Sequence, residues 1–116
     1  MIVGVKGTSS FDDYHVFLRA IGVALSSLPE NDSYFYIYSA GPAPVNKMVM
    51  EFVNISERGM KSRNKKIKMY KVAPSWIEEN MKDVDYFIFL SKENEPVSRL
   101  VREAELNNVE VGVFRY

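Results

Sequence analysis

The stretch Tyr86–Leu90, with the sequence YFIFL, is an unbroken apolar run in the second half of the chain. Such a run is typical of a strand that is buried on both faces of a parallel sheet, because helices cover both sides of that kind of sheet. The segments on either side have a helical period instead. A short helix is predicted over 75–82 and another over 97–106, so the buried strand lies between two helices.

The same alternation of strand and helix extends to both ends of the chain. The other strands are predicted at 2–6, 34–38, 66–72 and 109–114, and the other helices at 11–28 and 45–59. The order is βαβαβαβαβ, which predicts an α/β fold: one Rossmann-like three-layer sandwich over residues 1–116, with a five-stranded, mostly parallel sheet. The alternating, lysine-rich stretch 66–72 is expected near an edge of this sheet.

Local signals predict where the helices begin and end. Ser10 is expected to cap the first helix, and Gly59 is expected to end the second. Ser75, with an acid three residues later, has the form of a capping box, and Pro96 suits the first position of the last helix.

Composition excludes several kinds of function. Fifteen Lys and Arg residues balance fifteen Asp and Glu residues, and this zero net charge weighs against nucleic acid as a partner. With no cysteine and one histidine, the chain offers no thiolate or histidine-rich metal site, and we expect no cofactor. No apolar run is long enough to span a membrane and the start lacks the pattern of a signal peptide, so we expect a cytoplasmic protein with no membrane partner.

Ligands of open parallel sheets bind beyond the carboxyl ends of the strands, and three loops lie there. The candidate ligand-binding residues in these loops are Gly7, Thr8, Ser9 and Ser10, then Ser39, Ala40, Gly41 and Ala43, then Ser91, Lys92 and Glu93. The first loop offers hydroxyls and a helix N-terminus to an anion, or it only caps the helix. The second allows close approach of a ligand, or it is a rigid turn whose two prolines donate nothing. In the third, a lysine can meet a phosphate and a glutamate a ribose hydroxyl, or the loop is only solvated.

Two further features have two interpretations each. The basic run from Arg58 to Lys71 contains no acid; it can meet an anionic partner, or it is a solvated helix end and edge strand. Trp76 can stack on a base or pack in the core. The aromatic residues Tyr34, Tyr36, Tyr38 and Tyr116 look exposed. No Ser/His/Asp set, carboxylate pair or Walker loop is present.

Four short motifs resemble one family. GTSSFDDY at 7–14 resembles the GSRxFxDY opening of the YspA-like proteins, a branch of the SLOG (SMF/DprA–LOG) Rossmann-like superfamily. SAGPAPVNK at 39–47 stands where that branch has SGGARGADR, PSW at 74–76 resembles PADW, and DYFIF at 85–89 resembles ADxxIAF. The resemblance implies a five-stranded sandwich that binds nucleotides or nucleotide-derived ligands in the three loops, in bacterial or phage regulation and conflict. It also implies association into homo-oligomers.

The chain departs from that pattern at chemically important positions. Ser9 replaces the arginine of the first motif, prolines interrupt the second, and the glycine-rich glutamate loop of the hydrolytic branch is absent. The favoured hypothesis is therefore a non-catalytic binding module for a nucleotide-like small molecule. The alternative is an interaction protein, such as an adaptor, inhibitor or assembly component, that reuses the fold to bind a protein partner. A third hypothesis is an enzyme resembling the nucleotide N-glycosidases.

Overall fold

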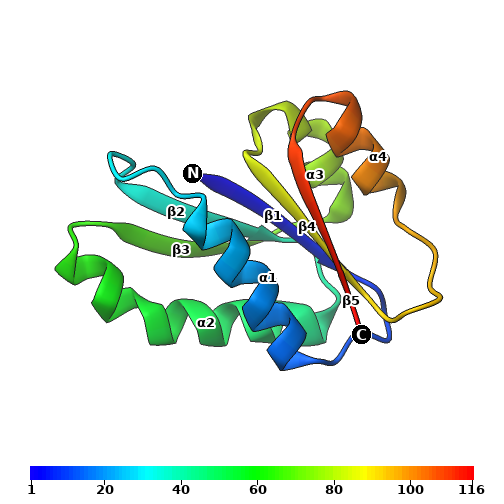
Figure 1. The fold of residues 1–116 in the computed structure, drawn as a ribbon, viewed down its shortest axis with the longest axis horizontal. Coiled ribbons are helices and arrows are strands. Elements are labelled where there is room, and N and C mark those ends of the chain that lie inside the picture. The colour runs from blue at the N-terminus through cyan, green and yellow to red at the C-terminus, as the bar shows by residue number, and fades with distance from the viewer.

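The computed structural model describes residues 1–116 and confirms the predicted α/β alternation (Figure 1). The elements are β1 (Ile2–Gly7), α1 (Tyr14–Ser26), β2 (Tyr34–Ser39), α2 (Ala43–Ser62), β3 (Lys66–Lys71), α3 (Pro74–Glu79), a 3₁₀ turn (Met81–Asp83), β4 (Tyr86–Ser91), α4 (Arg99–Leu106) and β5 (Glu110–Arg115). The five strands form one sheet in the order β3-β2-β1-β4-β5, and every neighbouring pair is parallel.

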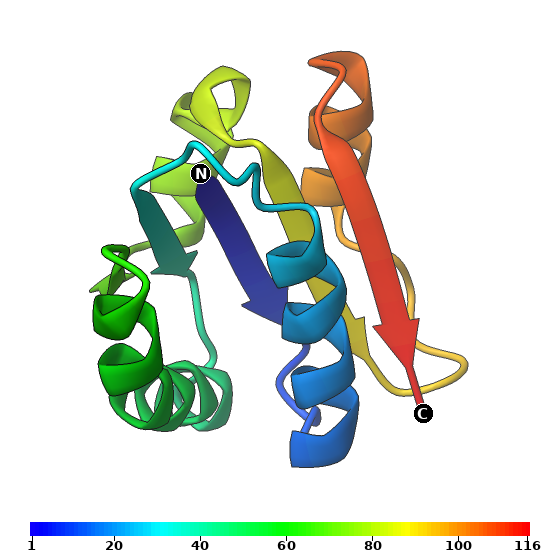
Figure 2. The same cartoon turned by 60° about the vertical axis from the view of Figure 1, so that its left-hand side comes forward.

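Helices cover both faces of the sheet, which gives the three layers of a Rossmann-like fold. The helices α1 and α2 lie on one face and share a core of 20 buried residues with the strands (Figure 2). The helices α3 and α4 lie on the other face over a smaller core of 10 buried residues. Strand β4 is buried along its whole length, as its unbroken apolar sequence predicts. Its side chains alternate between the two cores, with Phe87 in the smaller one and Ile88 in the larger.

Two predicted helix boundaries on the first face are wrong. The cap of α1 is Asp13, whose carboxylate accepts a hydrogen bond from the Val16 amide at 3.0 Å, and the hydroxyl of Ser10 is used elsewhere. Helix α2 continues through Gly59 to Ser62. The reason is packing: Met60 is buried in the larger core, and this burial stabilises the last turn of the helix beyond an exposed glycine.

Two predicted helix starts on the other face are also wrong. Helix α3 begins at Pro74, so Ser75 lies inside its first turn and makes no capping hydrogen bond. Helix α4 begins at Arg99 and is capped by Ser98, which leaves Pro96 in the preceding loop. Proline fits the first turn of a helix, but it fits an extended loop equally well, and here the serine decides the start.

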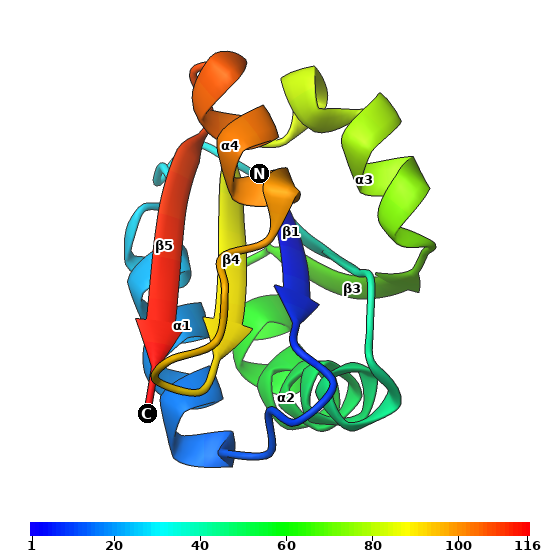
Figure 3. The same ribbon diagram turned by 90° about the vertical axis from the view of Figure 1, so that its right-hand side faces the viewer.

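The strand order reverses between β1 and β4. From β1 the chain proceeds outward through β2 to β3, and it then crosses back to β4 on the other side of β1. The chain leaves β1 and β4 at the same end of the sheet and leads to helices on opposite faces, α1 after β1 and α4 after β4 (Figure 3). This is the position where open parallel sheets form a crevice for ligands.

Strand β3 is an edge strand, as predicted from its alternating lysines.

No helix combines the length and the apolar character that crossing a bilayer requires.

Candidate functional site at the carboxyl edge

The three predicted loops meet at the carboxyl ends of the strands, which we call the carboxyl edge of the sheet. The amide of Thr8 donates to the carbonyl of Leu90 at 2.9 Å, which joins the loop after β1 to the end of β4. The amide of Gly7 donates to the carbonyl of Gly41 at 2.9 Å, which joins the same loop to the one after β2. Contacts therefore connect segments that are far apart in the sequence.

At this edge, three hydrogen-bond donors converge on the carboxylate of Glu95. The hydroxyl of Thr8 donates to Oε1 at 2.7 Å, and the hydroxyl of Ser10 donates to Oε2 at 2.6 Å. The main-chain amide of Lys92 donates to Oε1 at 2.6 Å. We call Thr8, Ser10 and the Lys92 amide the donor cluster. It is built from the loops after β1 and β4, at the point where the strand order reverses.

The donor cluster changes the acidity of Glu95. Hydrogen bonds from Ser10, Thr8 and the Lys92 amide favour the ionised form, and they hold the pKa of Glu95 below its usual value against a small opposing effect of burial. The three donors thus act as a binding site for an anionic oxygen group, which the chain itself supplies.

We expect Glu95→Gln to destabilise the protein at about pH 7 and to destabilise it less near pH 3. Because the folded-state pKa lies below the unfolded value, the carboxylate stabilises the fold fully above about pH 4.3 and loses this contribution as the pH falls through the folded-state pKa. Urea unfolding of the wild type and the variant between these pH values measures how their difference in stability depends on pH. Glu93→Gln is the matched control, and an equal difference between wild type and Glu95→Gln at both pH values contradicts the prediction.

The loop after β2 has a structural part at this edge, because the polar groups of Ser39 and Ala40 make hydrogen bonds within the protein. The Ser39 hydroxyl is fully buried and donates to Oδ1 of Asn46 at 2.5 Å. The Ala40 amide donates to the carbonyl of Val5 at 2.8 Å, and Gly41 has a positive φ of 88°, a conformation that suits glycine. Ala43 is the exposed first residue of α2 and borders a hollow of about 490 Å³ between α2 and β3.

The remaining predicted residues have different surroundings. Ser9 is exposed in the first loop. The amine of Lys92 lies 5.9 Å from the centre of the Tyr116 ring, and the amide of Glu93 donates to the Tyr116 carbonyl at 2.8 Å. The hydroxyl of Ser91 is fully buried and has no hydrogen-bond partner.

Sequence reasoning missed two residues at this edge. Glu95 belongs to the third candidate loop but is not among the candidate ligand-binding residues, and nothing local shows that hydroxyls from residues 85 or more positions away would reach it. Lys6 was read as part of a strand. It lies beside Phe89 on the same face of the sheet as Ser91, makes no ion pair, and has a pKa lowered by partial burial. A lysine inside an apolar strand was the available signal.

Other parts of the molecule offer less to a small ligand. No group of three or more His, Cys, Asp or Glu side chains is placed to hold a metal ion. A larger hollow of about 690 Å³ lies at the amino ends of β2 and β3, away from the predicted loops. Comparison with protein-family models, with curated proteins and with solved structures found no match to this chain, so the resemblance to the YspA-like branch stays a prediction.

Proposed function

We propose that this chain is a non-catalytic binding module for a nucleotide-derived anion, which binds at the donor cluster. The observation that carries the proposal is the convergence of two hydroxyls and one main-chain amide on a single carboxylate. A phosphate group presents the same kind of acceptor oxygens and carries at least the same charge.

In this proposal Glu95 is an internal competitor for the site. Its carboxylate holds the donors in place until a phosphate replaces it, and the half-buried side chain then moves with its loop toward solvent. The apparent affinity for a ligand is lowered by the fraction of molecules in which Glu95 occupies the donors.

Two unpaired polar groups nearby support an anionic ligand. Lys6 is a half-buried cation without an acidic partner, and the buried Ser91 hydroxyl has no partner either. Both lie on the α3/α4 side of the sheet at the carboxyl ends of β1 and β4. The nucleotide class is supported by the position at the reversal of strand order and by the family resemblance, which are analogies at the level of the fold.

We expect Glu95→Ala to bind nucleotide about tenfold more tightly than the wild type, because the variant frees three donors that otherwise bind the carboxylate. Isothermal titration calorimetry with AMP and with ADP-ribose measures the dissociation constants. Inorganic phosphate in a parallel titration shows how much of the affinity belongs to the phosphate alone.

The matched control is Glu105→Ala, which removes an exposed carboxylate from α4, away from the donor cluster, and should leave the affinity unchanged. Adding Thr8→Val and Ser10→Ala to Glu95→Ala should abolish the gain. The proposal fails if Glu95→Ala binds these probes no better than Glu105→Ala, or if loss of both hydroxyls leaves the gain intact.

A further inference from the structure

A second surface, independent of the carboxyl edge, lies on the outer half of the sheet. Strands β2 and β3 carry Tyr34, Tyr36 and Tyr38 in register with Lys66, Lys68 and Tyr70, so these six side chains share one face. Their neighbours Phe35, Ile37 and Ile67 point to the other face and are buried in the α1/α2 core. Together with Trp76 of α3, the six residues form what we call the tyrosine–lysine face.

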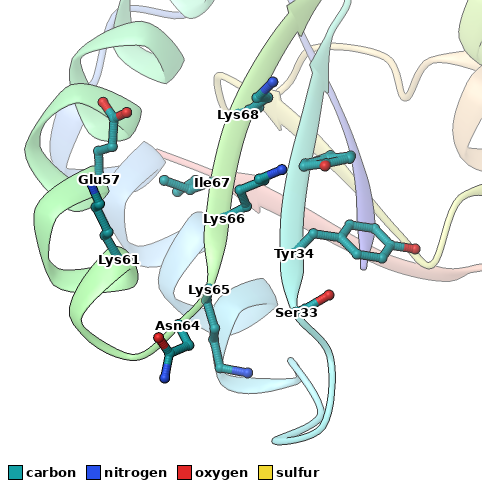
Figure 4. Close-up of a pocket in the computed structure, with 10 residues that line it drawn as sticks. Ser33, Tyr34, Glu57, Lys61, Asn64, Lys65, Lys66, Ile67 and Lys68 are labelled. Carbon is teal, nitrogen blue, oxygen red and sulfur yellow. The ribbon is translucent and has the colours of Figure 1, made fainter.

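No helix covers most of this face. The buried core on this side of the sheet is built mainly on β4, α3 and α4, and from β2 only Tyr38 packs against it. In Figure 4, Tyr34 and Lys66 project to the same side of the sheet, away from α2, whereas Ile67 projects toward α2. The three β2 tyrosines are half-buried, and Lys66, Lys68 and Tyr70 are exposed.

Three aromatic rings of the face form a continuous stack. Trp76 stacks on Tyr38 at 4.4 Å between ring centres, and Tyr38 stacks on Tyr70 at 4.7 Å, with interplanar angles of 8° and 15°. Tyr70 is 37% exposed and lies on the edge strand β3, so no further strand lies beyond its ring. Tyr36 contacts Tyr70 edge to face and is itself 4.7 Å from Tyr34.

The charge of the face is positive and unbalanced. Lys66 and Lys68 form no ion pair, and the neighbouring hollow of about 690 Å³ at the amino ends of β2 and β3 also contains Lys61 and Lys65, with Glu57 as its only acid. Although the chain is neutral as a whole, four of its nine lysines lie here. Net charge over the whole sequence therefore conceals a local basic surface.

Flat rings beside unpaired lysines complement a partner that carries both planar groups and negative charge. A second copy of the chain does not fit, because a two-fold contact through this face would place Lys66 and Lys68 near the same lysines of the other copy. A carboxylate-rich peptide matches the charge but offers no aromatic ring that could continue the stack. Single-stranded nucleic acid offers both, since its bases stack on aromatic side chains and its phosphates meet lysines.

We propose that the tyrosine–lysine face binds single-stranded nucleic acid. One base continues the stack on Tyr70, and the adjoining phosphates lie against Lys66 and Lys68. The face spans about 13 Å along the strands, which is room for a few nucleotides and sets an expectation of weak, salt-sensitive binding.

Fluorescence anisotropy with labelled oligothymidine and oligouridine of about twelve nucleotides tests the proposal. We expect Tyr70→Leu to weaken binding about tenfold and Tyr70→Phe, which keeps the ring, to bind as the wild type does. The double variant Lys66→Ala/Lys68→Ala should reduce the slope of log affinity against log salt by about 1.4, because two phosphate contacts are lost.

The matched control is Arg19→Ala/Lys47→Ala, which removes the same charge from exposed positions on α1 and α2, on the other side of the sheet. It should leave both the affinity and the salt slope unchanged. The proposal is overturned if the wild type binds neither oligonucleotide at about 50 mM salt, or if the control variant loses as much affinity as the lysine variant. It is also overturned if polyglutamate of equal charge competes as well as the oligonucleotide, because the rings would then contribute nothing.

Discussion

Replacing Phe87 by alanine is expected to lower the free energy of unfolding by about 3–5 kcal/mol. Phe87 is fully buried in the middle of β4, and its ring lies against Gly4 of β1 and close to Ile77 of α3. The core on this side of the sheet has half as many buried residues as the other. Few neighbours can therefore move into the cavity that the substitution leaves.

Urea unfolding followed by circular dichroism measures this loss. Val113→Ala is the control within the sheet, because Val113 of β5 is 41% exposed and its truncation should change the stability by only about 0.5 kcal/mol. If the two variants lose the same stability, the α3/α4 side of the sheet does not hold a packed core.

The second large effect is expected from Gly7→Ala, which should lower the unfolding free energy by about 1–3 kcal/mol. A Cβ at this position would lie 2.6 Å from Cγ2 of Val45. Val45 is fully buried and β-branched, so its side chain cannot rotate away at low cost. The substitution forces apart the loop after β1 and the start of α2.

A double-mutant cycle with Val45→Ala separates this clash from other causes. The pair should be less destabilised than the sum of the two single variants, because the smaller side chain makes room for the new methyl group. Gly22→Ala is the control. Nothing lies within 4 Å of a Cβ at this exposed position of α1, so the substitution should raise the free energy of unfolding by about 0.5–1 kcal/mol. Strict additivity at residues 7 and 45 would contradict the proposed contact.

The fold was predictable because its signals are local and repeated. The apolar run at Tyr86–Leu90 and the switches between the periods of strand and helix fix the order of the elements, and the structure confirms them. The ends of the helices were less predictable. Burial of Met60 decides where α2 ends, and Ser98 and Asp13 compete successfully with other candidate caps, so the outcome depends on tertiary packing that the sequence does not display.

The candidate site was predictable in position but not in content. Parallel strands bring their carboxyl ends together, so the three loops were expected at one edge, and hydrogen bonds connect them there. The partner of Thr8 and Ser10 could not be read from the chain, because Glu95 is 85 or more residues away from both. The tyrosine–lysine face was hidden for a different reason: a zero net charge says nothing about where the charges lie.

The position of β1 between β2 and β4 has a consequence for how the chain acquires its structure. Of the two partners of β1, β2 follows soon after it in the chain, but β4 begins at Tyr86 and is synthesised much later. Until then one whole edge of the central strand has unsatisfied amide and carbonyl groups. Closing so long a loop is slow, and the half-made sheet is open in the meantime to pairing with other nascent chains or to capture by chaperones.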